Sequence, residues 1–120
     1  MSKKTLVIGA SLKTERYSNK AINSLTNKNI EVVAIGLRKG TVAGVSIDKE
    51  NINYNNIHTV TLYLKPERQE EYYKYIIGLQ PKRVIFNPGT ENFDFIKLLK
   101  ENGIKSEIAC TLVLLSTNQY

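Results

Sequence analysis

Residues 5–25, TLVIGASLKTERYSNKAINSL, contain the pattern that decides the fold. Residues 5–9 form a short apolar run, rich in β-branched side chains and ended by a glycine, which is typical of a buried strand. Residues 18–25 repeat apolar side chains at helical spacing, and Ser18 is a suitable N-cap. The segment therefore predicts a strand, a polar loop over residues 9–18 and a helix, in that order.

The alternation of strand and helix patterns continues along the chain. The strand patterns are apolar on both faces, which is typical of parallel strands covered by helices on both sides. Residues 40–56 are polar and rich in turn formers, with at most a short extended piece around Val45 and Ile47. Residues 110–115 form an apolar tail compatible with a turn, a helix or an edge strand. Further strands are expected at residues 31–35, 58–64, 82–86 and 104–108, and further helices at residues 66–77, with Gly78 as the stop, and 91–102.

These elements predict an α/β fold: a Rossmann-like, doubly wound three-layer domain with a mostly parallel sheet of about five strands and right-handed crossovers. The length of 120 residues fits a single domain over residues 1–120. The sequence has no apolar run of about 18 residues and no signal-peptide core, and Cys110 is its only cysteine. We therefore expect a soluble, cytoplasmic protein without a membrane segment.

The net charge of +6, from 17 Lys and Arg against 11 Asp and Glu, favours an anionic partner such as a nucleotide, a nucleic acid or an acidic protein. The basic residues are dispersed and never form a block of five, which disfavours a nucleic-acid tail. In doubly wound sheets the ligand lies beyond the carboxyl ends of the strands. This rule nominates the loops at residues 9–18, 36–40, 63–66, 87–92 and 109–111.

The first two of these loops indicate the class of ligand. Residues 9–18 lack the G-x-G-x-x-G pattern, but their hydroxyl and basic side chains lead into a helix N-terminus, which suits a phosphate. Residues 36–40 lack the acidic residue that binds the ribose hydroxyls of NAD, and they carry Arg38 and Lys39 instead. A ligand with a phosphorylated ribose, either coenzyme A (CoA) or NADP, is therefore favoured over NAD.

Several stretches together resemble a known family. VIGASLKTERYSNKA at residues 7–21, the basic loop ending at Lys39, NPGTEN at residues 87–92 and ACTLV at residues 109–113 are similar to the CoA-binding protein family. Its small bacterial members resemble the N-terminal CoA-binding domain of the succinyl-CoA synthetase α subunit. The resemblance implies a Rossmann-like domain that binds CoA or acyl-CoA at the loops after the strands. The contacts expected are Gly9, Ser11, Lys13, Thr14, Tyr17, Ser18, Gly36, Arg38, Lys39, Leu64, Lys65, Pro66, Asn87, Pro88 and Gly89.

Two turns depart from the family pattern. The second strand commonly ends in a proline-containing turn, where this chain has Ile35-Gly36-Leu37. The third is often followed by an apolar residue and a proline, where this chain has Lys65 and Pro66. We expect Lys65 to add a contact to a phosphate.

No catalytic constellation is visible in the sequence. His58 stands at the start of a strand, away from the expected crevice, which indicates a surface or capping role, and Glu91 suits a helix cap or the helix dipole. No nucleophile with a base, no paired carboxylates and no metal-ligand cluster occur. We therefore expect a non-catalytic CoA or acyl-CoA binder. The alternatives are an NADP-linked oxidoreductase or other nucleotide-dependent enzyme domain, and a nucleic-acid-binding regulator.

Three other features leave choices open. Cys110 suits a buried small side chain, and its place after a strand also allows a mixed disulfide with the thiol of CoA. Tyr72 and Tyr73 lie on the apolar side of their helix, which favours core packing over stacking on nucleic-acid bases. The sheet edge and the tail at residues 112–115 are compatible with a homodimer or a partner enzyme subunit.

Overall fold

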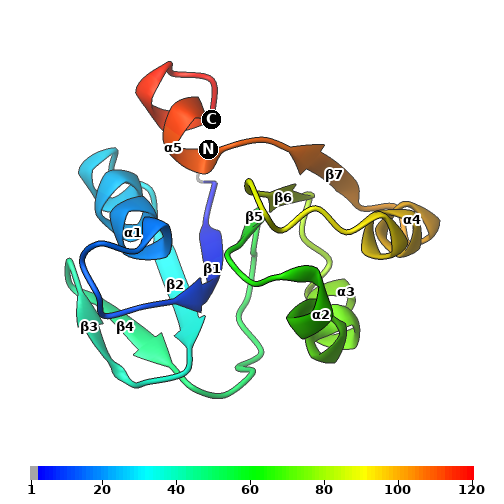
Figure 1. The fold of residues 1–120 in the computed structure, drawn as a ribbon, viewed down its shortest axis with the longest axis horizontal. Coiled ribbons are helices and arrows are strands. Elements are labelled where there is room, and N and C mark those ends of the chain that lie inside the picture. Colours follow the sequence, from blue (N-terminus) through cyan, green and yellow to red (C-terminus); the bar gives the residue numbers. More distant parts are fainter. Residues whose placement is uncertain (1–2) are drawn as a thin grey trace.

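A computed structural model describes residues 3–120 as a seven-stranded sheet with helices on both faces (Figure 1). The strand order is β3-β4-β2-β1-β5-β6-β7. The strands are β1 (Thr5–Ala10), β2 (Val32–Gly36), β3 (Gly40–Val42), β4 (Val45–Asp48), β5 (Thr59–Leu62), β6 (Arg83–Phe86) and β7 (Lys105–Ile108). The helices are α1 (Tyr17–Asn27), α2 (Pro66–Gln69), the 3₁₀ turn η1 (Glu70–Tyr72), α3 (Tyr73–Leu79), α4 (Phe93–Glu101) and α5 (Thr111–Ser116).

The predicted α/β fold is confirmed, and the predicted number of strands is wrong. β3 and β4 form an antiparallel hairpin within residues 40–56, and the other pairs in the sheet are parallel. Ala43 and Gly44, with φ of 50° and 79°, form the two-residue turn between the strands. Val42 and Ile47 are buried against the helical layer of α1, which fixes the hairpin on the sheet. Ala43 gives no turn signal because alanine rarely adopts a positive φ.

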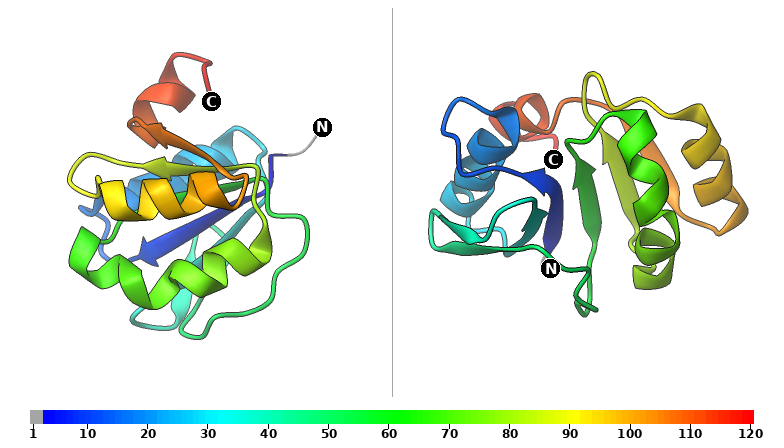
Figure 2. Two further views of the ribbon diagram at one scale, coloured as in Figure 1. Left: turned by 90° about the vertical axis from the view of Figure 1, so that its right-hand side faces the viewer. Right: turned by 60° about the horizontal axis from the view of Figure 1, so that its bottom comes forward.

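Side chains of the central strands alternate between two cores. Leu6 and Ile8 of β1 belong to a cluster that includes Phe86, Phe95 and Ile76, on the side of α3 and α4. Val7 of β1 belongs to the opposite cluster, on the side of α1 and α5. Figure 2 shows these two helical layers with the sheet between them. Burial on both faces explains why β1 and β2 carry continuous apolar runs rather than an alternating pattern.

The first helix begins two residues earlier than the predicted N-cap implies. Arg16 is the N-cap, with extended φ and ψ of −75° and 142° and no side-chain capping hydrogen bond. Ser18, predicted as the N-cap, lies inside the first turn and is 3% exposed. That prediction is wrong because Ser18 packs inward, where its small side chain fits. The N-terminal N–H groups of α1 therefore have no capping side chain.

The predicted helix over residues 66–77 is interrupted. Pro66 starts α2, η1 follows as a tighter turn, and α3 runs on past Gly78 to Leu79. Gln80, with φ of 50°, ends α3 in the left-handed conformation, so Gly78 is not the stop. Tyr73 stacks on Phe95 with ring centroids 4.2 Å apart, which confirms its predicted core role.

The tail after β7 is helical. Cys110 is the N-cap of α5 and is partly buried, and Leu115 reaches the core on the side of α1. Over residues 3–120, none of the helices combines the length and the apolar character that crossing a bilayer requires.

Candidate functional site

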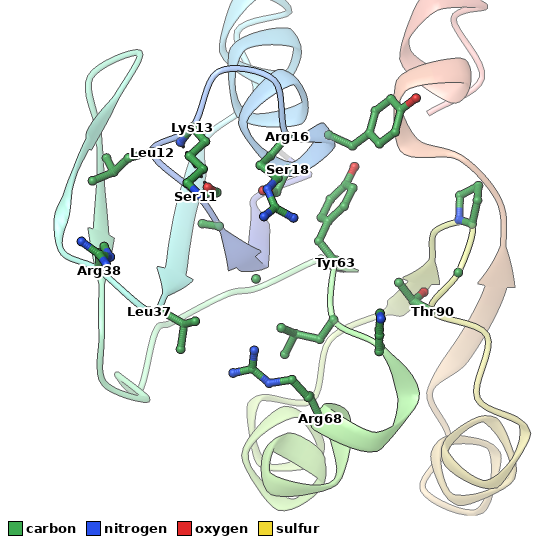
Figure 3. Close-up of a pocket in the computed structure, with 17 residues that line it drawn as sticks. Ser11, Leu12, Lys13, Arg16, Ser18, Leu37, Arg38, Tyr63, Arg68 and Thr90 are labelled. Atoms are coloured by element: carbon green, nitrogen blue, oxygen red, sulfur yellow. Dashed lines mark hydrogen bonds between the residues drawn. The ribbon is translucent and has the colours of Figure 1, made fainter.

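The carboxyl ends of β1, β2, β5 and β6 border a cleft of about 550 Å³ (Figure 3). It lies where the strand order reverses, because β1 has β2 on one side and β5 on the other. Parallel sheets bind their ligands at this position. Its lining comes from the end of β1, from the loops after these strands, from the start of α1 and from α2: Gly9, Ala10, Ser11, Leu12, Lys13, Arg16, Tyr17, Ser18, Leu37, Arg38, Tyr63, Leu64, Lys65, Arg68, Pro88, Gly89 and Thr90.

Gly9 lets β1 turn away beside the end of β5. Its φ is +91°, and a Cβ atom there would lie 2.8 Å from the backbone oxygen of Tyr63. Any other residue would be strained at this φ and would collide with the neighbouring strand. The cleft floor therefore depends on a glycine at position 9.

The β1–α1 loop, residues 11–16, is held by hydrogen bonds near its own ends. The Ser11 side-chain oxygen accepts from the Lys13 N–H at 3.1 Å, and the buried Asn19 amide donates to the Ser11 carbonyl oxygen at 2.9 Å. Lys13 and Arg16 remain exposed on the cleft wall, next to the uncapped N-terminus of α1. Unpaired N–H groups, the positive end of the helix dipole and two cations together favour a phosphate.

The charge of the cleft is entirely positive. No Asp or Glu occurs among its described lining residues. Within residues 3–120, none of its basic side chains has a carboxylate within 4.0 Å. Cations without acidic neighbours raise the local concentration of anions. These side chains, which we call the cleft cations, are Lys13, Arg16, Arg38, Lys65 and Arg68.

Gln69 joins two of the loops that border the cleft. It is fully buried, and its Nε2 donates to the carbonyl oxygens of Leu64 at 2.8 Å and of Thr90 at 2.7 Å. Its Oε1 accepts from the Asn92 amide at 3.1 Å. The loop after β5, the start of α2 and the loop after β6 are thereby fixed relative to one another. A glutamine in a helix gives no sequence signal for such a role.

Asn87 forms a second link, and it faces the interior rather than the cleft. Its Nδ2 donates to Thr61 Oγ1 at 2.7 Å and to the Leu62 carbonyl oxygen at 2.8 Å, while its Oδ1 accepts from the Thr111 N–H at 2.9 Å. The side chain is 2% exposed, so its hydrogen-bonding groups are already used. Asn87 is predicted from the sequence as a ligand contact, but in the structure its side chain joins β5, β6 and α5.

The loop after β6 ends in a capped helix. Asn92 is the N-cap of α4, accepting from the Phe95 N–H at 3.1 Å. Glu91 instead accepts from the N–H of Gly89 at 2.9 Å, within the turn. The predicted link between Glu91 and the helix end is thus replaced by a bond that shapes the turn beside the cleft.

Neither Tyr63 nor His58 is placed as a base for chemistry in the cleft. Burial raises the pKa of Tyr63 to about 12, so its phenol is neutral at physiological pH. His58 precedes β5, at the opposite end of the strand from the cleft, with its Nδ1 2.7 Å from Thr59 Oγ1. Burial lowers the pKa of His58, and Arg83 lowers it further.

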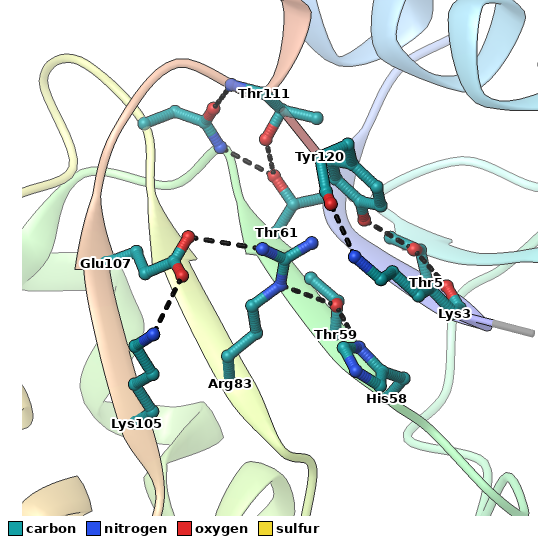
Figure 4. A network of polar contacts seen from close by, with 11 residues as sticks. Lys3, Thr5, His58, Thr59, Thr61, Arg83, Lys105, Glu107, Thr111 and Tyr120 are labelled. Carbon is teal, nitrogen blue, oxygen red and sulfur yellow. Dashed lines mark hydrogen bonds and ion pairs between the residues drawn. The ribbon is translucent and has the colours of Figure 1, made fainter. Parts of the chain in front are cut away.

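Arg83 organises a separate polar network around the amino ends of β5 and β6 (Figure 4). Its Nε donates to Thr59 Oγ1 at 2.9 Å, and its Nη1 pairs with Glu107 at 3.2 Å. The Tyr120 ring covers the guanidinium, with the ring centroid 4.5 Å from Arg83 Cζ. The network therefore holds the chain's last residue against the sheet and takes no part in the cleft.

The structure brings most of the predicted contacts to the cleft, but not Thr14, Gly36, Lys39, Pro66 or Asn87. Gly36 ends β2, where a Cβ would collide with the Ala10 backbone oxygen. Six further residues line the cleft within the nominated loops but are not among the predicted contacts: Ala10, Leu12, Arg16, Leu37, Tyr63 and Thr90. Arg68 lies outside those loops, inside α2, and only the direction in which this helix docks reveals it.

Comparisons with known proteins identify the fold and the family. The family described as "CoA binding domain" matches residues 3–116. A crystal structure described as that of an uncharacterized protein is 45% identical, with a TM-score of 0.96, and the match covers 100% of this chain and 99% of that chain. A hypothetical protein from Pyrococcus horikoshii OT3 is 26% identical over 97% of this chain and 83% of that chain, with a TM-score of 0.86. A search of curated proteins found no match.

A more distant structure, from Thermus thermophilus, shares the fold at 18% identity, with a TM-score of 0.86 over 99% of this chain and 91% of that chain. The fold is therefore retained where most side chains differ. The family match extends over almost all of the residues that form the sheet, its helices and the cleft. The chain belongs to the CoA binding domain family.

Proposed function

We propose that the cleft binds CoA or acyl-CoA and that the chain is a binding protein without a catalytic centre of its own. The observation that carries this proposal is the set of cleft cations, none of which has a carboxylate within 4.0 Å among residues 3–120. CoA carries a diphosphate and a 3′-phosphate on its ribose, so its charge matches such a cleft. Membership of the CoA binding domain family supports the same ligand.

The lining suggests how the ligand is oriented. Lys13, Arg16 and the N-terminus of α1 would hold the diphosphate, as helix N-termini do in other nucleotide sites. Arg38, at the end of β2, would bind the 3′-phosphate, because the ribose lies next to this strand in doubly wound folds. Lys65 would add a contact to either phosphate. The uncharged turn at Pro88 and Gly89 would then face the pantetheine arm.

The chemistry of the cleft supports binding rather than catalysis. Its described lining contains no histidine, cysteine or carboxylate. Tyr63 keeps its proton at physiological pH because burial raises its pKa to about 12. Nucleophilic or acid–base chemistry needs a group that changes its protonation state near neutrality. A partner enzyme subunit or a second copy of the chain stays a prediction, as does a cytoplasmic location.

An NADP-linked oxidoreductase is the second candidate, because Arg38 is equally suited to a 2′-phosphate on ribose. A nucleic-acid-binding regulator has less support, since its cations would follow an extended strand rather than meet in one cleft.

Isothermal titration with CoA, 3′-dephospho-CoA, adenosine and NADPH separates these candidates. We expect CoA to bind at least tenfold more tightly than 3′-dephospho-CoA, and NADPH fluorescence to stay unchanged on mixing. CoA binding no tighter than adenosine would refute the proposal, and NADPH binding tighter than CoA would favour the oxidoreductase. Native mass spectrometry of freshly purified protein identifies any nucleotide that copurifies.

A further inference from the structure

Arg68 is a cleft residue that the pattern of loops does not indicate. It lies in α2, one residue before the fully buried Gln69, and its own side chain is exposed on the cleft wall. Within residues 3–120 it has no carboxylate within 4.0 Å. No ion pair among the described residues therefore explains an arginine at this position.

The backbone that carries Arg68 is held in place. Gln69 bonds to the Leu64 and Thr90 carbonyl oxygens and to the Asn92 amide, so α2 cannot roll without breaking these bonds. Each buried polar group left without a partner costs about 1–3 kcal/mol. Arg68 therefore extends from a fixed point, and Figure 3 shows its guanidinium reaching toward Leu37.

Leu37 forms the facing wall and is unusually exposed for a large apolar residue, at 67%. It follows β2 directly and lines the cleft. The loop that carries Leu37 leads into Gly40, which packs closely against the β1–α1 loop. A Cβ atom at Gly40 would collide with the Leu12 side chain. An exposed leucine beside a cleft offers a surface for an apolar or flat group of the ligand.

The end of β2 is the position beside the ribose in doubly wound folds, so the base of a bound nucleotide lies close to Leu37. A purine has two flat faces. An apolar side chain packs on one face, and a planar guanidinium stacks on the other through cation–π attraction. Leu37 and Arg68 present these two surfaces from opposite walls.

We propose that Leu37 and Arg68 hold the purine base of the ligand between them, with Arg68 acting through its flat face rather than through its charge alone. This inference rests on the proposed binding of CoA. It assigns to α2 a role in recognising the nucleoside, in addition to the phosphate contacts made by the loops.

The test compares CoA with a fragment of CoA that lacks the base, the ribose, the 3′-phosphate and one phosphate of the diphosphate. CoA contains adenine, whereas 4′-phosphopantetheine has the same arm and one phosphate but no base. Arg68→Ala should weaken the binding of CoA about tenfold, in line with the loss of a desolvated cation–π contact. The same change should weaken the binding of 4′-phosphopantetheine less than twofold, measured by its displacement of CoA. Lys97→Ala, at an exposed site on α4 outside the cleft, serves as the control.

Two further variants separate stacking from charge. Arg68→Lys keeps the positive charge but removes the planar guanidinium group. We therefore expect this variant to bind CoA at least fivefold more weakly than the native protein does. Leu37→Ala should cost less in the Arg68→Ala background than alone, because both residues contact the same base.

Full recovery of CoA affinity in Arg68→Lys, or equal losses for CoA and 4′-phosphopantetheine in Arg68→Ala, would overturn the stacking role. Unchanged CoA binding in Arg68→Ala would do the same. If the native protein itself fails to bind CoA, the proposed function is what fails.

Discussion

Gln69 Nε2 donates a 2.7 Å hydrogen bond to the carbonyl oxygen of Thr90, and both groups are buried between the loops after β5 and β6. The bond fixes one wall of the cleft from inside. The charged side chains on that wall thus depend on a buried amide that does not line the cleft.

Gln69→Met keeps the approximate volume of the side chain and removes its hydrogen-bonding groups. The Leu64 and Thr90 carbonyl oxygens lose their side-chain donor, so we expect the free energy of unfolding to fall by about 2–4 kcal/mol. Urea unfolding measures this loss. Gln119→Met, at an exposed position, should change it by less than about 0.5 kcal/mol. Equal effects at the two sites would contradict a structural role for the buried amide.

Gly9→Ala tests whether the cleft floor needs a glycine. With φ of +91° and the Tyr63 oxygen 2.8 Å from the new Cβ, we expect a loss of about 2–3 kcal/mol, measured as a lowered Tm. Gly78→Ala is the matched control, because Gly78 lies in α3 with open space around its Cβ position. That change should raise stability by about 0.5–1 kcal/mol.

Arg38 and Lys39 are adjacent cations, but only Arg38 lines the cleft. Arg38→Ala should weaken the binding of CoA about tenfold. It should weaken the binding of 3′-dephospho-CoA less than threefold, because this ligand lacks the phosphate that Arg38 would contact. Lys39→Ala should leave both affinities within twofold. Isothermal titration at two salt concentrations checks this expectation, and a larger loss at Lys39 would assign the phosphate contact to the other side chain.

Stability should fall in alkali through Tyr63. Burial raises the pKa of its phenol from 10.0 to about 12, so the unfolded chain loses this proton at lower pH than the folded protein does. The contribution of Tyr63 to the free energy of unfolding is complete below pH 10 and is lost as the pH rises from 10 to 12. Urea unfolding of Tyr63→Phe should show a shallower decline across this range. Tyr75 retains part of the decline, because burial also raises its pKa to about 12. An unchanged slope would show that Tyr63 is not involved.

The order of strands and helices could be predicted because the buried parallel strands are rich in apolar and β-branched residues and end near loops of turn formers. The extended piece predicted around Val45 and Ile47 corresponds to β4, but β3 and its pairing with β4 could not be predicted, since the turn uses Ala43 at a positive φ and only Val42 and Ile47 are well buried. Short edge strands carry too few apolar residues for a period to appear.

The position of the cleft followed from the rule for parallel sheets, whereas its individual side chains were harder to predict. Asn87 has the polarity of a ligand contact, yet its bonds are used inside the fold. Arg68 looks like a surface residue of a helix until the docking of α2 is known. The direction of a side chain is set by tertiary hydrogen bonds such as those of Gln69, which leave no local pattern.

The two walls of the cleft are built differently. The wall with Gln69 and Asn87 is joined by buried bonds that connect β5, β6, α2 and α5, whereas residues 11–16 are held by hydrogen bonds to Ser11 and to nearby backbone. Replacing residues 12–16 would therefore leave the other wall intact. In a lineage of such proteins, this segment is where a new ligand preference could arise from a few substitutions without loss of the fold.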